Sequence, residues 1–179
     1  MKSDEELLQA LRDPSCKYDA FEEIVRRYSQ PLYLQIRRLV QWHDDADDVL
    51  QNTFLKAWGA IASFRGESRL STWLYRIALN EALTFLTRTK TADSLDEAVD
   101  GAARSLQSDP YFDGDELQAR LQEAISLLPP KQRVVFNMKY FDEMKYEEMS
   151  DILGTSVGAL KASYHLAVKK IEAYFRERN

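Results

Sequence analysis

Residues 145–171 read KYEEMSDILGTSVGALKASYHLAVKKI, and this stretch decides the fold class of the C-terminal part of the chain. Its apolar spacing predicts two helices, from Lys145 to Leu153 and from Ser156 to Phe175, joined by a turn that contains Gly154. Ser156 is expected to cap the second helix, because its hydroxyl can accept a hydrogen bond from an unpaired backbone N–H. Such a pair is typical of a helix-turn-helix, whose second helix enters the DNA major groove. The alternative is an ordinary helical hairpin with a basic, solvated surface.

The last part of the chain is locally basic. From Val157 to Asn179, five basic residues stand against two acidic ones. In a helix-turn-helix, Lys161 and Lys169 would meet phosphates or guanine edges.

The rest of the chain is also patterned for helices. Apolar residues recur every three or four positions in five further stretches, which are Phe21 to Val40, Asp44 to Ile61, Ser71 to Leu86, Leu117 to Leu128 and Gln132 to Phe141. Pro31 is expected to kink or divide the first of them. Ser71 is expected to cap the third, and Pro129 and Pro130 to stop the fourth. The pattern predicts an all-α protein.

The segment from about Thr87 to Phe112 has no sustained period and is rich in Ser, Ala and Asp. It is typical of a linker. We therefore predict two small helical domains, residues 1–88 and 115–179, joined by a flexible acidic linker at residues 89–114.

The net charge of −5 does not exclude binding to nucleic acid. The segment from Lys90 to Gln118 holds eight acidic and two basic residues, so the remainder of the chain has a net charge of +1. Binding to a polyanion depends on local patches and not on the total charge.

An aromatic and basic stretch, FRGESRLSTWLYR, lies at residues 64–76. Aromatic rings beside guanidinium groups suit single-stranded DNA, because the rings stack on unpaired bases and the cations attract phosphates. For Trp73 taken alone, a core position is favoured over a DNA contact, because helical spacing places it beside Ile77. Ahead of this stretch, the acidic residues of DDADDVLQ at 44–51 favour a polar protein partner or a plain solvated surface.

The sequence argues against several kinds of site and several classes of protein. Cys16 is the single cysteine, so neither an internal disulfide nor a thiolate metal cluster is expected. The first residues are acidic, unlike a signal peptide, and no stretch is apolar enough to span a membrane, so we expect a cytoplasmic protein. With His43 and His165 as the only histidines and no Gly-rich phosphate loop, we expect no catalysis, no cofactor, no metal and no small-molecule substrate.

Two segments together resemble one known family. The string DDADDVLQNTFLKAWGAI at 44–61, followed by FRGESRLSTWLYRIALNEAL at 64–83, resembles region two of the extracytoplasmic-function sigma factors. The stretch from Ser126 to Ile171 resembles their region four. The resemblance implies a protein that binds core RNA polymerase and directs promoter recognition and DNA melting at transcription initiation.

The resemblance also implies roles for particular residues. The partners would be core RNA polymerase, through its β′ clamp coiled coil and β flap, promoter DNA and an anti-sigma factor that can hold the protein at the inner membrane. The β′ contact would use Asp45, Asp48 and Gln51. The −10 element, as a single strand, would be held by Phe64, Arg65, Ser68, Arg69, Trp73, Arg76 and Asn80. The −35 duplex would be contacted by Ser156, Lys161, Ser163, Tyr164, His165 and Lys169.

One departure from the family and one alternative function remain. Family members often carry arginines where this chain has Ser163 and Leu166, so its phosphate contacts or base preference would differ. The alternative is a conventional helix-turn-helix regulator, which leaves the aromatic and basic stretch without a role. A regulator should bind duplex promoter alone, whereas a sigma factor should need polymerase.

Overall fold

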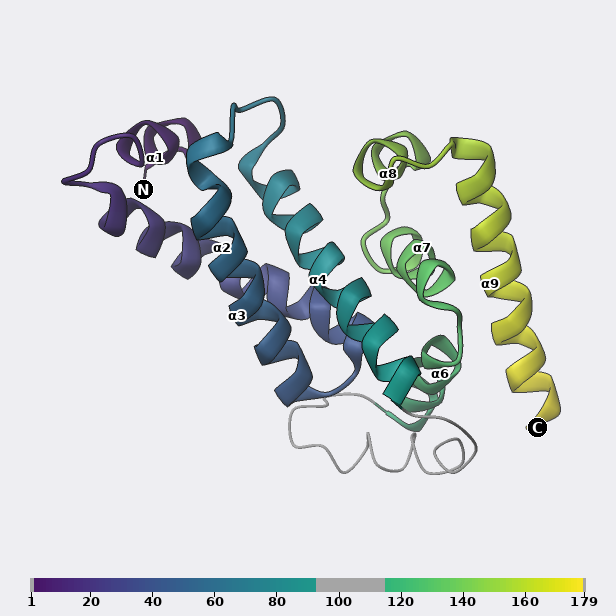
Figure 1. Ribbon diagram of the computed structural model, residues 1–179. Coiled ribbons are helices and arrows are strands. Elements are labelled where there is room, and N and C mark those ends of the chain that lie inside the picture. Colours follow the sequence, from purple (N-terminus) through teal and green to yellow (C-terminus); the bar gives the residue numbers. More distant parts are fainter. Residues whose placement is uncertain (1, 93–114, 179) are drawn as a thin grey trace.

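The computed structural model describes residues 2–92 and 115–178, and in these two ranges the regular elements are helices (Figure 1). This confirms the all-α prediction. The N-terminal half, residues 2–92, contains α1 (Asp4–Ala10), α2 (Lys17–Val40), α3 (His43–Ala60), the 3-10 turn η1 (Ile61–Ser63) and α4 (Leu70–Ala92). The C-terminal half, residues 115–178, contains α6 (Glu116–Ser126), α7 (Pro130–Tyr140), α8 (Tyr146–Leu153) and α9 (Val157–Glu177). Residues 93–114, most of the expected linker, lie outside the described residues.

In the N-terminal half, α2, α3 and α4 pack side by side with α1 laid against α2 (Figure 1). Each helix buries its apolar stripe, as its spacing predicts. The core includes Leu7, Ile24, Ile36, Ala57 and Leu74, each almost fully buried. No helix in the described ranges has the length and hydropathy needed to cross a membrane.

In the C-terminal half, the expected helix-turn-helix is formed by α8 and α9. Gly154 ends α8 in the left-handed conformation with φ of 62°, which glycine adopts without strain. The Ser156 hydroxyl accepts a hydrogen bond of 3.3 Å from the Ala159 N–H and so caps α9 as predicted. Met149 and Leu160, both buried, hold the two helices together.

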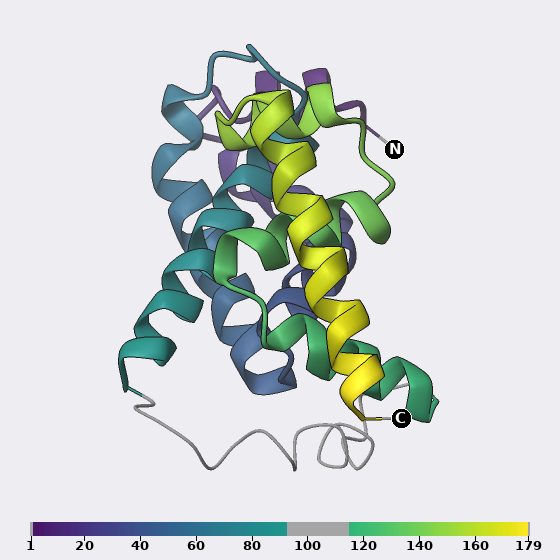
Figure 2. The same cartoon turned by 90° about the vertical axis from the view of Figure 1, so that its right-hand side faces the viewer.

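The two halves pack against one another through α7 and α8, which lie beside α2 and α4 (Figures 1 and 2). Val134, Val135 and Met138 of α7 belong to the same buried cluster as the core of the N-terminal half. The closed arrangement is thus held by a shared apolar core.

Polar contacts fix the register of this packing. Asp142, in the turn after α7, accepts a 2.9 Å ion-pair hydrogen bond from Arg38 of α2 and a 3.4 Å hydrogen bond from the Tyr75 hydroxyl of α4. Burial raises the pKa of the Asp142 carboxyl, while Arg38 acts in the opposite direction. The buried Arg133 of α7 donates a 2.9 Å hydrogen bond to the Leu39 carbonyl, and burial lowers its pKa to about 10.

One local expectation was wrong in part, and another was wrong. Pro31 does not divide α2, which runs unbroken from Lys17 to Val40. Pro31 is exposed, so the carbonyl that loses its helical partner can be solvated. Ser71 does not cap α4, because the helix already begins at the buried Leu70 and the Trp73 N–H bonds to the Arg69 carbonyl.

Two further features were not anticipated. The helix α4 continues to Ala92, so the first residues of the expected linker segment from Thr87 are helical. The helix α1 was not predicted, although Ser3 and Glu6 form a capping box that the sequence pattern S-x-x-E signals.

Removing either partner of the Arg38–Asp142 pair should weaken the packing of the halves. We expect Arg38→Ala and Asp142→Ala to be non-additive, with a coupling of about 1–2 kcal/mol in urea unfolding of the full chain. The matched control is Arg26→Ala on the same helix, whose ion pair with Glu23 is largely exposed and should contribute little. Strictly additive effects of Arg38→Ala and Asp142→Ala would show that the pair does not stabilise the closed arrangement.

Candidate DNA-binding surfaces

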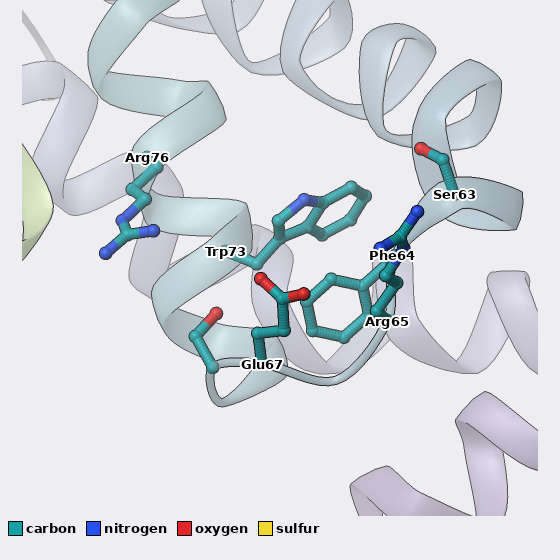
Figure 3. Close-up of a pocket in the computed structure, with 7 residues that line it drawn as sticks. Ser63, Phe64, Arg65, Glu67, Trp73 and Arg76 are labelled. Atoms are coloured by element: carbon teal, nitrogen blue, oxygen red, sulfur yellow. The ribbon is translucent and has the colours of Figure 1, made fainter.

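A pocket lies where the loop after α3 meets the start of α4 (Figure 3). We call it the loop pocket, and its volume is about 510 Å³. Pockets for small organic ligands span roughly 300–1,000 Å³. The volume of the loop pocket lies within this range, so the pocket has room for a nucleobase. It is lined by Ser63, Phe64, Arg65, Glu67, Ser68, Trp73 and Arg76.

Two aromatic rings form one wall of the loop pocket. The ring centroids of Phe64 and Trp73 lie 4.9 Å apart with planes inclined at 35° (Figure 3). Both side chains are only partly buried, so ring surface faces the pocket. Gly66, with φ of 76°, turns the chain between the helices, in a conformation that an L side chain rarely adopts. This turn brings Phe64 back onto the first turn of α4.

Charged groups flank the rings on two sides. Arg65 lies beside Phe64, and Arg76 extends from α4 on the other side of Trp73, while the Glu67 carboxyl points towards the rings (Figure 3). The Arg76 Nη2 donates a 2.7 Å hydrogen bond to the Asp151 carbonyl of α8. Its Nε is buried and has no hydrogen-bond partner within the described ranges. Arg76 therefore touches both the loop pocket and the C-terminal half.

The loop pocket collects five of the seven residues expected at single-stranded DNA, namely Phe64, Arg65, Ser68, Trp73 and Arg76. Arg69 is exposed but is not among the lining residues. Asn80 lines a different cavity of about 210 Å³ between the halves, together with Leu160 and Ser163. Sequence reasoning missed Ser63 and Glu67, although both lie within or next to the quoted stretch.

The residues expected at duplex DNA divide between two sides of α9. Lys161, His165 and Lys169 are exposed, and their spacing of four places them on one face. Ser163 faces the cavity between the halves, and Ser156 is the cap. Tyr164 is half-buried and stacks on Phe136, with centroids 5.8 Å apart and planes at 16°, and burial raises the pKa of its hydroxyl.

The acidic start of α3 presents the residues expected to contact polymerase. Asp48 and Gln51 are exposed and Asp45 is partly buried. Burial raises the pKa of the Asp45 carboxyl, and the nearby charges of Asp48 and Asp44 raise it further. Within the described residues, no group of three or more His, Cys, Asp or Glu side chains is placed to hold a metal ion.

Comparison with solved structures shows that the fold is shared with two proteins, one of which is a known sigma factor. The chain aligns with the sigma factor RpoE from Bartonella quintana, in a complex with the anti-sigma factor NepR, at a TM-score of 0.66 and 22% identity, covering 87% of this chain and 96% of that one. It also aligns with CnrH, in a complex with the cytosolic domain of CnrY, at a TM-score of 0.66 and 23% identity, covering 99% and 100% of the two chains.

Sequence comparison identifies the family. The family model for sigma-70 region 2 matches residues 24–92, and that for sigma-70 region 4 matches residues 118–171. The chain is 32% identical to the ECF RNA polymerase sigma factor SigW of Bacillus subtilis, over 89% of this chain and 90% of the relative. It is 31% identical to the ECF RNA polymerase sigma-E factor of Escherichia coli, over 86% and 85%. The chain therefore belongs to the extracytoplasmic-function RNA polymerase sigma factors, which direct polymerase to promoters at transcription initiation.

Proposed function

We propose that this sigma factor uses the loop pocket to hold an unpaired base of the −10 element while α9 binds the −35 element as duplex. The observation that carries the proposal is the Phe64–Trp73 ring pair, flanked by Arg65 and Arg76 in one pocket. Stacking on an aromatic ring contributes about 1–3 kcal/mol per base, and the two cations attract the neighbouring phosphates.

Glu67 bears on which base the loop pocket accepts. A carboxylate repels phosphate, so it favours a base edge rather than backbone on its side of the pocket. Carboxylates accept hydrogen bonds from exocyclic amino groups, as Glu and Asp do from cytosine N4. We therefore expect a preference for a base that carries an amino group.

For the −35 element, the exposed stripe of α9 is the better candidate surface. Lys161, His165 and Lys169 are on its solvent side, whereas the ring of Tyr164 is stacked on Phe136. We assign the duplex contacts to those three residues and a packing role to Tyr164.

The closed arrangement cannot reach both elements at once. Elements about 25 base pairs apart are separated by about 85 Å along B-DNA at 3.4 Å per base pair. A folded chain of this length has a radius of gyration of only about 16 Å. On a promoter, the halves must therefore separate, which breaks the Arg38–Asp142 pair and releases Arg76 from the Asp151 carbonyl.

Core polymerase supplies the energy for this opening by binding the halves at separate places. Asp45, Asp48 and Gln51 on α3 are proposed to contact the β′ clamp coiled coil, and the C-terminal half the β flap. Leu55, one turn beyond Gln51 and 69% exposed, offers an apolar contact on the same helix. The protein itself has no catalytic step and acts where polymerase acts, in the cytoplasm.

The first test is run-off transcription with core polymerase on a genomic fragment library, which identifies a promoter. On that promoter, Trp73→Ala and Arg76→Ala should reduce open complex about five- to hundredfold, the equivalent of 1–3 kcal/mol. The control is Arg88→Ala, an exposed arginine of the same helix outside the loop pocket, which should transcribe normally. Permanganate reactivity of the −10 region measures the melting.

A template already mismatched at the −10 region separates the two DNA contacts. The Trp73→Ala defect should shrink on it, because melting is no longer required. The Lys161→Ala defect should persist, since the duplex phosphate contact is still missing. Wild-type open complex with Trp73→Ala on the intact duplex would rule out the loop pocket as the site of base capture.

Tyr164 gives an independent test of the α9 assignment. Tyr164→Ala should destabilise the full chain by about 1–3 kcal/mol in urea unfolding, because it removes a half-buried stacked ring. Tyr164→Phe keeps the ring and should leave both stability and transcription near wild type, and Lys161→Ala should leave stability unchanged. A Tyr164→Phe protein that folds normally but loses −35 recognition would return Tyr164 to the duplex-contacting set.

We also infer an anti-sigma partner for this chain. The support is the likeness to two solved folds, one in a complex with the anti-sigma factor NepR and the other in a complex with the cytosolic domain of CnrY. Affinity purification of the chain from its native cell, before and after stress, should yield a protein besides the polymerase subunits that competes with core polymerase. Recovery of polymerase subunits alone under both conditions would count against it.

A further inference from the structure

A second cavity adjoins the loop pocket, between the α1–α2 turn and the end of α3. We call it the turn groove, and its volume is about 750 Å³. Both views place α1 beside the loop that follows α3 (Figures 1 and 2). It is lined by Leu8, Leu11, Arg12, Pro14, Lys17, Ile61, Ala62, Phe64, Arg65 and Gly66.

The turn groove adjoins the loop pocket, because Phe64 and Arg65 line both cavities. A strand that leaves the loop pocket past these two residues on the α1 side would next meet the turn groove. Arg12 and Lys17 of the turn groove precede the segment that the sigma-70 region 2 model matches, because that segment begins at residue 24.

All the charged residues that line the turn groove are basic. Its charged residues are Arg12, Lys17 and Arg65, and no carboxylate is among its lining residues. Nearby acids have other partners. Asp13 accepts hydrogen bonds of 2.9 and 2.8 Å from the Ser15 N–H and hydroxyl, and Asp4 accepts one of 2.9 Å from Arg27.

Lys17 is held in place by an aromatic ring. Its ammonium lies 4.4 Å from the centroid of the Trp58 ring on α3. A cation–π contact of this kind restrains the side chain and leaves the ammonium free to meet an anion. Lys17 is thus positioned before any ligand arrives.

The turn groove is also lined by apolar side chains. Leu11 and Ile61 are buried and Leu8 is half-buried, and Phe64 lines both this groove and the loop pocket. A lining of cations together with apolar side chains suits the phosphates and bases of a single strand.

We propose that the turn groove binds the non-template single strand next to the captured base, with Arg12 and Lys17 as phosphate contacts. This inference rests on the proposed base capture in the loop pocket. It assigns a DNA-binding role to the turn that follows α1, through Arg12, and to the first residue of α2, Lys17. The probe is forked promoter DNA, taken from the promoter found by run-off transcription, whose non-template strand ends at the captured base or extends beyond it.

The experiment measures the affinity of the core polymerase complex for these forks by fluorescence anisotropy. The wild-type protein should bind the fork with the longer non-template strand more tightly than the fork whose strand ends at the captured base. The variant Arg12→Ala/Lys17→Gln should bind the long fork with about tenfold lower affinity than wild type and the short fork with unchanged affinity. Its salt slope on the long fork should fall by about 1.4, since each lost single-strand phosphate contact removes about 0.7.

Two controls separate a local effect from misfolding. Arg26→Ala removes an exposed arginine of α2 that does not line the turn groove, and it should bind both forks as wild type does. Arg12→Lys keeps the charge and should retain most of the gain. Normal binding of the short fork by Arg12→Ala/Lys17→Gln shows that the loop pocket is intact.

The outcomes distinguish this inference from the function on which it rests. If Trp73→Ala binds the short fork as tightly as wild type does, base capture in the loop pocket is wrong. If Trp73→Ala weakens the short fork but the gain on lengthening survives in Arg12→Ala/Lys17→Gln, the loop pocket stands and the turn groove does not bind the strand. Loss of the gain in that variant alone, with an altered salt slope, establishes the site.

Discussion

The packing of the turn after α7 onto α2 and α4 sets the arrangement of the whole molecule. Asp142 brings a carboxylate into a partly buried site, where it would be costly unless Arg38 and Tyr75 met it. Val134, Val135 and Met138 then bury their side chains in the core of the N-terminal half. The apolar cluster supplies most of the favourable free energy, while the ion pair selects one register of the two halves.

This packing links structure to function because it uses some of the residues proposed to meet DNA. Arg76 lines the loop pocket yet donates to the Asp151 carbonyl, and Asn80 borders the cavity between the halves. The helix α9 lies on the outside of the molecule, in front of α7 in Figure 2, and its residues Lys161, His165 and Lys169 are exposed. The proposed duplex-binding surface is accordingly accessible in the closed form, whereas full use of the proposed strand-binding surface would require the halves to part.

The loop between α3 and α4 joins the proposed DNA contacts of the N-terminal half. The turn at Gly66 folds Phe64 back onto Trp73 and leaves Arg65 between two cavities. One cavity has two rings suited to a base, and the other has cations and apolar side chains suited to the adjoining backbone. A single loop conformation thereby positions a base site and a neighbouring phosphate site.

The sequence alone determined the features that depend on neighbours along the chain. Apolar spacing gave the main helices, Gly154 and Ser156 gave the helix-turn-helix, and the aromatic and basic stretch marked five residues of the loop pocket, because each depends on a local period or turn. Tertiary structure alone decided the rest. Periodicity predicts the helix face on which Tyr164 lies but not that its ring stacks on Phe136. No local pattern links Arg38 to Asp142, which are 104 residues apart. Arg12 and Arg65 likewise line one groove only because of long-range packing. The local sequence pattern does not determine which helix faces and turns contact one another.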